Sequence, residues 1–140
     1  MASEAVFADA SFFFALAAKR DAAHASAVGQ LGTLLRQERR IVTTDYVVDE
    51  ALTLTKARTN AAVAVALLDR IDRSEAIEVE LVSLGRFDLA KVFFRQHADH
   101  DYSFTDCTSF VVMRELRLTE VLTTDSHFVE AGFRALLRPR

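Results

Sequence analysis

Short apolar runs alternate with longer stretches of helical periodicity along the chain, and this alternation is what most constrains its fold. The runs at 5–8, 41–43 and 121–123 are nearly continuous, as expected for strands covered on both faces. Residues 77–81 instead alternate apolar side chains with glutamates, which predicts an edge strand with one solvated face. Strands separated by helical segments are typical of parallel sheets with helical crossovers. The pattern therefore predicts an α/β sandwich.

The segments between and after these strands carry apolar residues at helical spacing. They predict helices at 12–19, 22–39, 46–56, 60–73, 87–97 and 105–116, and a short helix near Phe128. The short basic end at 134–140 is assigned no element. Eleven Phe and no Trp supply bulky apolar filling without indole N–H groups, so Phe12, Phe13 and Phe14 are predicted to lie in the core.

A chain of 140 residues has the size of one domain, so 1–140 is predicted to form a single unit. The longest uninterrupted apolar run, 61–68, is far shorter than the roughly 18 residues that indicate a membrane span. The amino terminus lacks the basic start of a secretory signal, and Cys107 has no second cysteine to pair with. These features predict a cytoplasmic protein without a membrane segment.

The net charge of −3 provides no overall positive field for nucleic acid or anionic lipid. A polyanionic partner must therefore be held by local groups. Basic residues are concentrated at Arg36, Arg39, Arg40, Lys56 and Arg58. This stretch is either such a local contact or an ordinary solvated helix face.

Four carboxylates fall where a parallel sheet gathers functional groups or where a helix faces the core. Asp9 and Asp125 each follow an apolar strand, and parallel sheets bind ligands beyond the carboxyl ends of their strands. Glu50 and Asp106 lie in predicted helices and share a face with apolar side chains. A carboxylate on an inward stripe is costly to bury unless it is protonated, paired or bound to a metal.

Metal coordination is the simpler account, because no Lys or Arg lies one turn from Glu50 or Asp106 on the same stripe. Hard cations such as Mg²⁺ prefer oxygen ligands and are usually held by a few carboxylates. Capping is the alternative for the other positions: Asp9 and Asp125 precede helices, and Ser103 with Asp106 has the spacing of a capping box. Glu50 is in mid-helix and cannot cap, so it is the strongest evidence for a metal site among the four acids.

The stretches around these acids resemble the PIN-domain ribonucleases over residues 6–136. The resemblance lies in Asp9-Ala-Ser11, Asp49-Glu50-Ala-Leu-Thr-Leu, Asp101-Tyr-Ser-Phe-Thr-Asp106-Cys-Thr-Ser-Phe and Leu122-Thr-Thr-Asp125-Ser-His-Phe. The last two stretches are similar in particular to the VapC-type toxins of toxin–antitoxin pairs. The resemblance implies a three-layer α/β/α sandwich whose parallel sheet has about five strands.

The resemblance also implies a site and a reaction. Its acidic site for Mg²⁺ or Mn²⁺ would be Asp9, Glu50, Asp106 and Asp125, with Ser11 and Thr123 as small hydroxyl residues beside it. Ala10 departs from the Thr or Ser of many relatives, which affects only fine tuning. The implied reaction is metal-dependent, water-mediated hydrolysis of RNA by a toxin. Its implied partners are a VapB-like antitoxin, whose basic residue reaches the acidic pocket, and a second copy in a homodimer.

Two other functions stay open. One is a PIN-type nuclease of RNA processing, and the other is a catalytically silent interaction module whose acids only cap helices. Lys19, Arg20, Lys56 and Arg58 are the candidate phosphate contacts of a nuclease.

Three further features receive a structural interpretation. The cluster His97-Ala-Asp99-His100-Asp101 is interpreted as a polar helix end and loop, because its candidate metal ligands are bunched without a distant closing pair. His127 follows Asp125 closely, but a helix start or packing is favoured over a role in the pocket. Cys107 is predicted to be a small buried residue, since no Cys/His nucleophile arrangement is evident.

Overall fold

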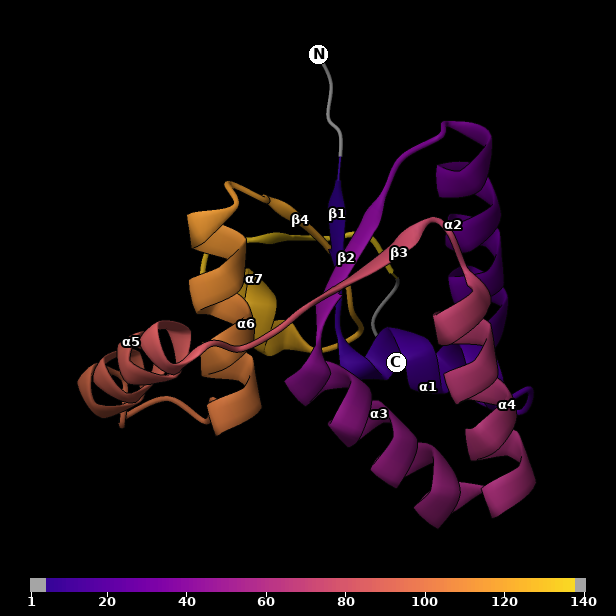
Figure 1. Cartoon of the computed structure of the whole chain (residues 1–140), viewed down its shortest axis with the longest axis horizontal. Coiled ribbons are helices and arrows are strands. Elements are labelled where there is room, and N and C mark those ends of the chain that lie inside the picture. Colours follow the sequence, from indigo (N-terminus) through magenta and orange to yellow (C-terminus); the bar gives the residue numbers. More distant parts are fainter. Residues whose placement is uncertain (1–4, 138–140) are drawn as a thin grey trace.

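The computed structural model describes residues 5–137 and places a five-stranded parallel sheet between two sets of helices (Figure 1). The strands are β1 (Val6–Ala8), β2 (Ile41–Thr44), β3 (Ile77–Glu80), β4 (Glu120–Leu122) and β5 (Arg134–Ala135). Their order across the sheet is β3-β2-β1-β4-β5, and every neighbouring pair is parallel. The predicted α/β/α fold is confirmed, and so is the edge position of the strand predicted at 77–81.

Seven helices flank these strands within the described residues. They are α1 (Ala10–Ala17), α2 (His24–Arg36), α3 (Asp45–Arg58), α4 (Ala61–Arg73), α5 (Leu84–Gln96), α6 (Phe104–Glu115) and α7 (Ser126–Glu130). In Figure 1, α2 and α4 lie on one side of the sheet and α5, α6 and α7 on the other. None of the helices in 5–137 is long and apolar enough to cross a membrane.

The predicted helices are all present, with ends that differ by at most three residues. The largest differences arise from caps and turns rather than from apolar spacing. For example, α5 begins at Leu84 because the hydroxyl of Ser83 accepts the backbone N–H of Arg86. Such a cap satisfies a donor that the first turn of a helix leaves without a partner.

The helix α1 supplies bulky side chains to the core. Phe12 and Phe13 are fully buried with ring centroids 5.2 Å apart, and Phe14 is 5% exposed. The prediction that these phenylalanines belong to the core is confirmed. Because α1 also contacts α2, α3 and α4, its first turn is held firmly at the end of β1. This packing fixes the position of Asp9.

Near the end of the described residues lies a short strand, β5, that the sequence does not predict. Arg134 and Ala135 pair with β4, after the chain has turned at Gly132 with a φ of 100°. That backbone conformation favours glycine, which has no Cβ to clash. The assignment of no element to the basic end is therefore wrong for Arg134 and Ala135, while 138–140 lie outside the described residues. A two-residue strand shows no periodicity, so only its pairing reveals it.

Candidate active site

Two of the four predicted acids emerge at the same edge of the sheet. Asp9 directly follows β1 and Asp125 closely follows β4, and these two strands are neighbours. The backbone N–H of Asp9 donates to the carbonyl of Leu122 at 3.1 Å, which ties the strand ends together. Although Asp9 precedes α1, its side chain makes no cap hydrogen bond to that helix. Capping therefore does not account for this acid.

Two hydroxyl groups hold the Asp9 carboxylate. The hydroxyls of Ser11 and Thr123 donate to its Oδ2 at 3.0 and 2.9 Å. Ser11 also accepts the backbone N–H of Thr124, and Thr123 accepts that of Asp125, both at 3.0 Å. Each hydroxyl thus donates its single proton to Asp9 and accepts a hydrogen bond from the backbone that follows β4. The carboxylate, which is 5% exposed, is oriented through one of its oxygens.

Asp106 is brought to the site by the start of α6. Its backbone N–H donates to the hydroxyl of Ser103 at 2.9 Å, and its Oδ2 accepts the backbone N–H of Ser103 at 3.0 Å. This is the predicted capping box. The same carboxylate is buried and close to the charge of Asp125. Capping and membership of the acidic site are thus compatible for this residue.

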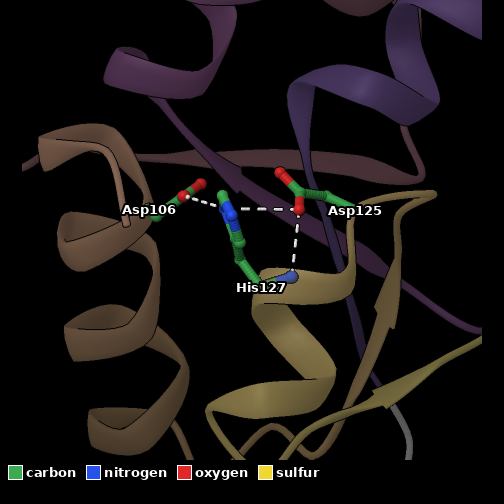
Figure 2. A group of neighbouring side chains, drawn as sticks. All are labelled: Asp106, Asp125 and His127. Atoms are coloured by element: carbon green, nitrogen blue, oxygen red, sulfur yellow. Dashed lines mark hydrogen bonds and ion pairs between the residues drawn. The ribbon is translucent and has the colours of Figure 1, made fainter. Parts of the chain in front are cut away.

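Asp125 and His127 complete this side of the site from the start of α7. Oδ1 of Asp125 accepts the backbone N–H of His127 at 2.9 Å, so the predicted capping is present here too. The ring Nδ1 of His127 lies 3.0 Å from Oδ2 of Asp106 and 3.3 Å from Oδ1 of Asp125 (Figure 2). His127 thus lies at a helix start, as predicted, but its ring also reaches the acidic site, a role that the sequence did not favour. Its direction depends on how α7 docks beside α6, which spacing alone does not reveal.

Glu50 lies at the rim of the site rather than on an inward stripe. α3 buries Val47, Ala51 and Thr55, which follow one another every four residues, and leaves Glu50 exposed. The predicted inward orientation is therefore wrong. Nevertheless, its pKa is raised to about 7, first by partial burial and then by the charges of Asp9, Asp106 and Asp125. Glu50 thus lies within the electrostatic field of the other three acids.

Burial and mutual repulsion raise the pKa values within the site. Burial first, and then the charge of Asp106, raise the pKa of Asp9 to about 6. Burial also raises the pKa of Asp106, against the effect of its hydrogen bonds with Ser103 and His127. Burial acts to lower the pKa of His127, but the hydrogen bond with Asp106 and the charge of Asp125 raise it above its ordinary value. The acids therefore disfavour full ionisation until a cation is added.

The donor set suits a hard divalent cation. One ligand atom each from Asp106, Asp125 and His127 lie within 4.8 Å of one another, a group that could hold a metal ion. No Lys or Arg in 5–137 forms an ion pair with any of the four acids. Carboxylate oxygens are the ligands that Mg²⁺ and Mn²⁺ prefer. The residues present thus fit a metal centre that would supply the missing positive charge.

The predicted phosphate contacts separate into two groups. Lys19, Arg20 and Arg58 line one hollow beside Phe14 and Val63, whereas Lys56 does not line it. The guanidinium of Arg58 lies 5.6 Å from the ring centroid of Phe14.

Two other arginines of the basic stretch form ion pairs. Arg39 pairs with Glu120 at 2.7 Å, and Arg40 pairs with Glu78. These two ion pairs connect the residues before β2 to the strands β4 and β3.

Cys107 and the histidines of the 97–101 cluster take the structural roles predicted for them. Cys107 is fully buried, and burial raises the pKa of its thiol to about 11, which keeps it protonated at neutral pH. His97 stacks on Phe93 at 4.0 Å, and His100 stacks on Tyr102 at 4.7 Å. Neither histidine belongs to a candidate metal group among the described residues.

Comparison with known proteins identifies the family of the chain. The sequence matches the PIN domain family over residues 6–134. It is 32% identical over 128 residues to the 23S rRNA-specific endonuclease VapC20 of Mycobacterium tuberculosis strains CDC 1551 / Oshkosh and H37Rv, covering 91% of this chain and 95% of the relative. The crystal structure of Mycobacterium tuberculosis VapC20, a sarcin-ricin loop cleaving toxin, is similar with a TM-score of 0.81 and the same coverage. The chain therefore belongs to the PIN-domain family and, within it, to the VapC-type nucleases.

Proposed function

We propose that the protein is a single PIN-like domain that hydrolyses RNA phosphodiester bonds with the help of Mg²⁺ or Mn²⁺, and that it is the toxin of a VapBC-type pair. The observation that carries this proposal is the convergence of three carboxylates from separate elements, of which Asp9 and Asp106 are buried and Asp125 is partly exposed. Asp9 follows β1, Asp106 starts α6 and Asp125 follows β4. The charges of all three raise the pKa of Glu50.

Asp9, Glu50, Asp106 and Asp125 are the residues proposed to hold the metal. A divalent ion bound there would supply an activated water and stabilise negative charge on the phosphoryl oxygens. The chain itself contributes orientation: the hydroxyls of Ser11 and Thr123 fix one oxygen of Asp9. Backbone N–H groups fix one oxygen of Asp106 and one of Asp125. Such prior orientation avoids reorganising the ligands when the substrate arrives.

A catalytically silent module is a weaker account of this site. A carboxyl whose pKa is raised by burial destabilises the folded protein when it ionises at neutral pH. A module that used its acids only as caps would have no need to bury Asp9, whose side chain caps nothing. A nuclease of RNA processing shares the proposed chemistry and differs only in its cellular role.

The proposed substrate is a loop of ribosomal RNA. The relatives of this chain are named for cleavage of 23S rRNA and of the sarcin-ricin loop. We extend that substrate class to this protein because the similarity covers 91% of the chain. Single-stranded loops expose bases and phosphates that proteins can contact, which suits an open acidic edge. A cytoplasmic location is part of the same proposal.

Two protein partners belong to the proposal. A VapB-like antitoxin would place a cation among the acids, where charge complementarity favours it. A homodimer is proposed as well. Exposed large apolar side chains gather at the end of β3 and along α5, among them Leu81, Leu84, Leu89 and Val92. Light scattering should show a dimer that Leu89→Lys weakens, and a wild-type monomer at micromolar concentration would reject it.

The nuclease proposal is tested with purified protein and ribosomal RNA. Cleavage is expected with Mg²⁺ or Mn²⁺, should stop with EDTA, and should be lost in Asp106→Asn. Asp99→Asn, a change at an exposed position outside the site, is the matched control. Sequencing of the new RNA ends would identify the target. Undiminished cleavage by Asp106→Asn would reject the mechanism.

The toxin role needs a test in cells. Controlled expression of the wild type should arrest growth, and co-expression of a small partner encoded beside it should relieve the arrest. Expression of Asp106→Asn should have no effect on growth. Normal growth with active wild-type protein would favour the role in RNA processing instead.

A further inference from the structure

The ring of His127 lies between two carboxylates that come from different helices. Its Nδ1 is 3.0 Å from Oδ2 of Asp106, at the start of α6, and 3.3 Å from Oδ1 of Asp125, before α7 (Figure 2). A single N–H on Nδ1 can be shared between two acceptors at these distances. This ring therefore connects two of the acids through one donor.

The oxygens that His127 contacts are those already engaged by the backbone. Oδ2 of Asp106 also accepts the N–H of Ser103, and Oδ1 of Asp125 also accepts the N–H of His127 itself. Within residues 5–137, no hydrogen bond or ion pair involves Oδ1 of Asp106 or Oδ2 of Asp125. In Figure 2, no dashed line reaches the second oxygen of either carboxylate. Each carboxylate thus has one fixed oxygen and one available oxygen.

The ring is itself held in place. The ring of Tyr102 packs against it in an edge-to-face arrangement, with centroids 5.7 Å apart and an interplanar angle of 78°. Tyr102 is buried and also contacts Phe110 of α6 at 5.0 Å. The imidazole therefore has a supported orientation on the side facing α6, and its hydrogen bonds do not depend on a freely rotating side chain.

We propose that His127 is a positioning residue of the metal centre: its Nδ1–H holds Oδ2 of Asp106 and Oδ1 of Asp125, so that their remaining oxygens face a bound cation. This inference rests on the proposed metal-dependent function. A hydrogen-bond donor to a metal-ligating side chain fixes the orientation of that side chain. Loss of such a donor typically weakens metal binding by about 10- to 100-fold. In this role His127 contacts neither the ion nor the RNA.

The test compares three variants by Mn²⁺ affinity, measured from the electron paramagnetic resonance of free Mn²⁺. His127→Leu removes the donor and should weaken Mn²⁺ binding by about tenfold. In His127→Asn the side-chain amide N–H occupies a position close to Nδ1, so this variant should restore most of the affinity. His127→Gln places its amide near the position of Nε2 and should not restore it. Thermal unfolding in EDTA controls for loss of the fold.

The possible results separate this inference from the proposed function. If the wild type binds no Mn²⁺, the proposed function fails and the role of His127 fails with it. If the wild type binds Mn²⁺ and His127→Leu binds equally well, only the positioning role is overturned. Rescue by His127→Gln but not by His127→Asn would overturn the assignment to Nδ1. A nitrogen coupling to bound Mn²⁺ that disappears in folded His127→Leu would show a direct ligand and would also overturn it.

Discussion

The hydroxyl of Thr123 donates to Oδ2 of Asp9 at 2.9 Å across 114 positions of the chain. The same hydroxyl accepts the backbone N–H of Asp125 at 3.0 Å. One small side chain therefore connects the acid after β1 with the acid after β4. Because Thr123 is fully buried, no water replaces either hydrogen bond if the hydroxyl is removed.

Thr123→Val should therefore weaken both the fold and the metal site. The substitution keeps the shape but leaves the Asp125 N–H without its acceptor and Asp9 without one of its two hydroxyl donors. We expect a loss of about 1 to 3 kcal/mol in the free energy of unfolding, measured with urea. The pKa of Asp9 should rise further, since the hydrogen bond from Thr123 lowers it. Thr119→Val, at an exposed position, is the control, and equal stability of the two variants would contradict the prediction.

Asp9→Asn should stabilise the metal-free protein while abolishing RNA cleavage. Burial raises the pKa of Asp9 from 3.8 to about 6, so the folded state binds more protons than the unfolded state between these pH values. Stability must therefore fall as pH rises through this window. At pH near 7.5, Asn removes this cost, and its amide oxygen can still accept from Ser11. We expect a gain on the order of 1 to 3 kcal/mol in EDTA. A destabilised Asp9→Asn would show that the carboxylate is stabilising.

Metal affinity should increase as pH rises, whereas the stability of the metal-free protein decreases. Protons compete with the cation for Glu50, whose pKa is raised to about 7, and for Asp9, whose pKa is raised to about 6. Mn²⁺ binding should therefore strengthen as pH rises from about 5.5 to 7.5. Glu50→Gln should bind more weakly but lose the upper part of this dependence. Isothermal titration at several pH values measures both effects, and a wild-type affinity that is flat over this range would contradict them.

The sequence predicts most of what the backbone topology determines. Parallel strands explain why Asp9 and Asp125 meet at one edge, and the spacing of Ser103 and Asp106 predicts a capping box that the structure confirms. In these cases the relevant geometry is local, or follows from neighbouring strands that run in the same direction. The direction of a side chain on a docked helix follows from neither.

The residues that the sequence describes incorrectly depend on such docking. Glu50 is exposed because α3 turns Val47 and Ala51 toward the core, an orientation that one turn of periodicity does not determine. His127 enters the site only because α7 packs beside α6. Similarly, Arg134 and Ala135 become a strand through pairing with β4 alone. Tertiary contacts decide all of these features.

Arg86, whose side chain is largely buried, should contribute strongly to stability. Its Nε and Nη2 donate to the two oxygens of Glu115 at 3.0 and 2.6 Å, and its Nη1 donates to Glu80 at 2.9 Å. This fork joins α5 and α6 to the edge strand β3. Arg86→Lys keeps the charge but loses the two-pronged geometry, so we expect a loss of about 1 to 2 kcal/mol in urea unfolding. Arg95→Lys on the same helix is the control, and equal unfolding midpoints would contradict the prediction.

The hollow lined by Lys19, Arg20 and Arg58 suggests where the RNA strand continues beyond the acids. α1 starts beside Asp9 and α3 carries Glu50, and the two helices pack together. Eight residues of helix separate Glu50 from Arg58, which is about 12 Å at 1.5 Å per residue. Within residues 5–137, none of these three cations forms an ion pair. We therefore expect these cations to contact a phosphate a few nucleotides from the cleaved bond, although Asp21 lines the same hollow.

Arg58→Glu should weaken RNA binding without changing Mn²⁺ affinity. The charge reversal removes one phosphate contact and adds repulsion, so the salt dependence of RNA affinity should lose about one unit of slope. Fluorescence anisotropy in Ca²⁺ or EDTA measures binding without relying on cleavage. Arg95→Glu, an equal charge change on α5, is the matched control and should retain wild-type affinity. If both variants lose affinity equally, overall charge and not this hollow attracts the RNA, because only a local contact distinguishes Arg58 from Arg95.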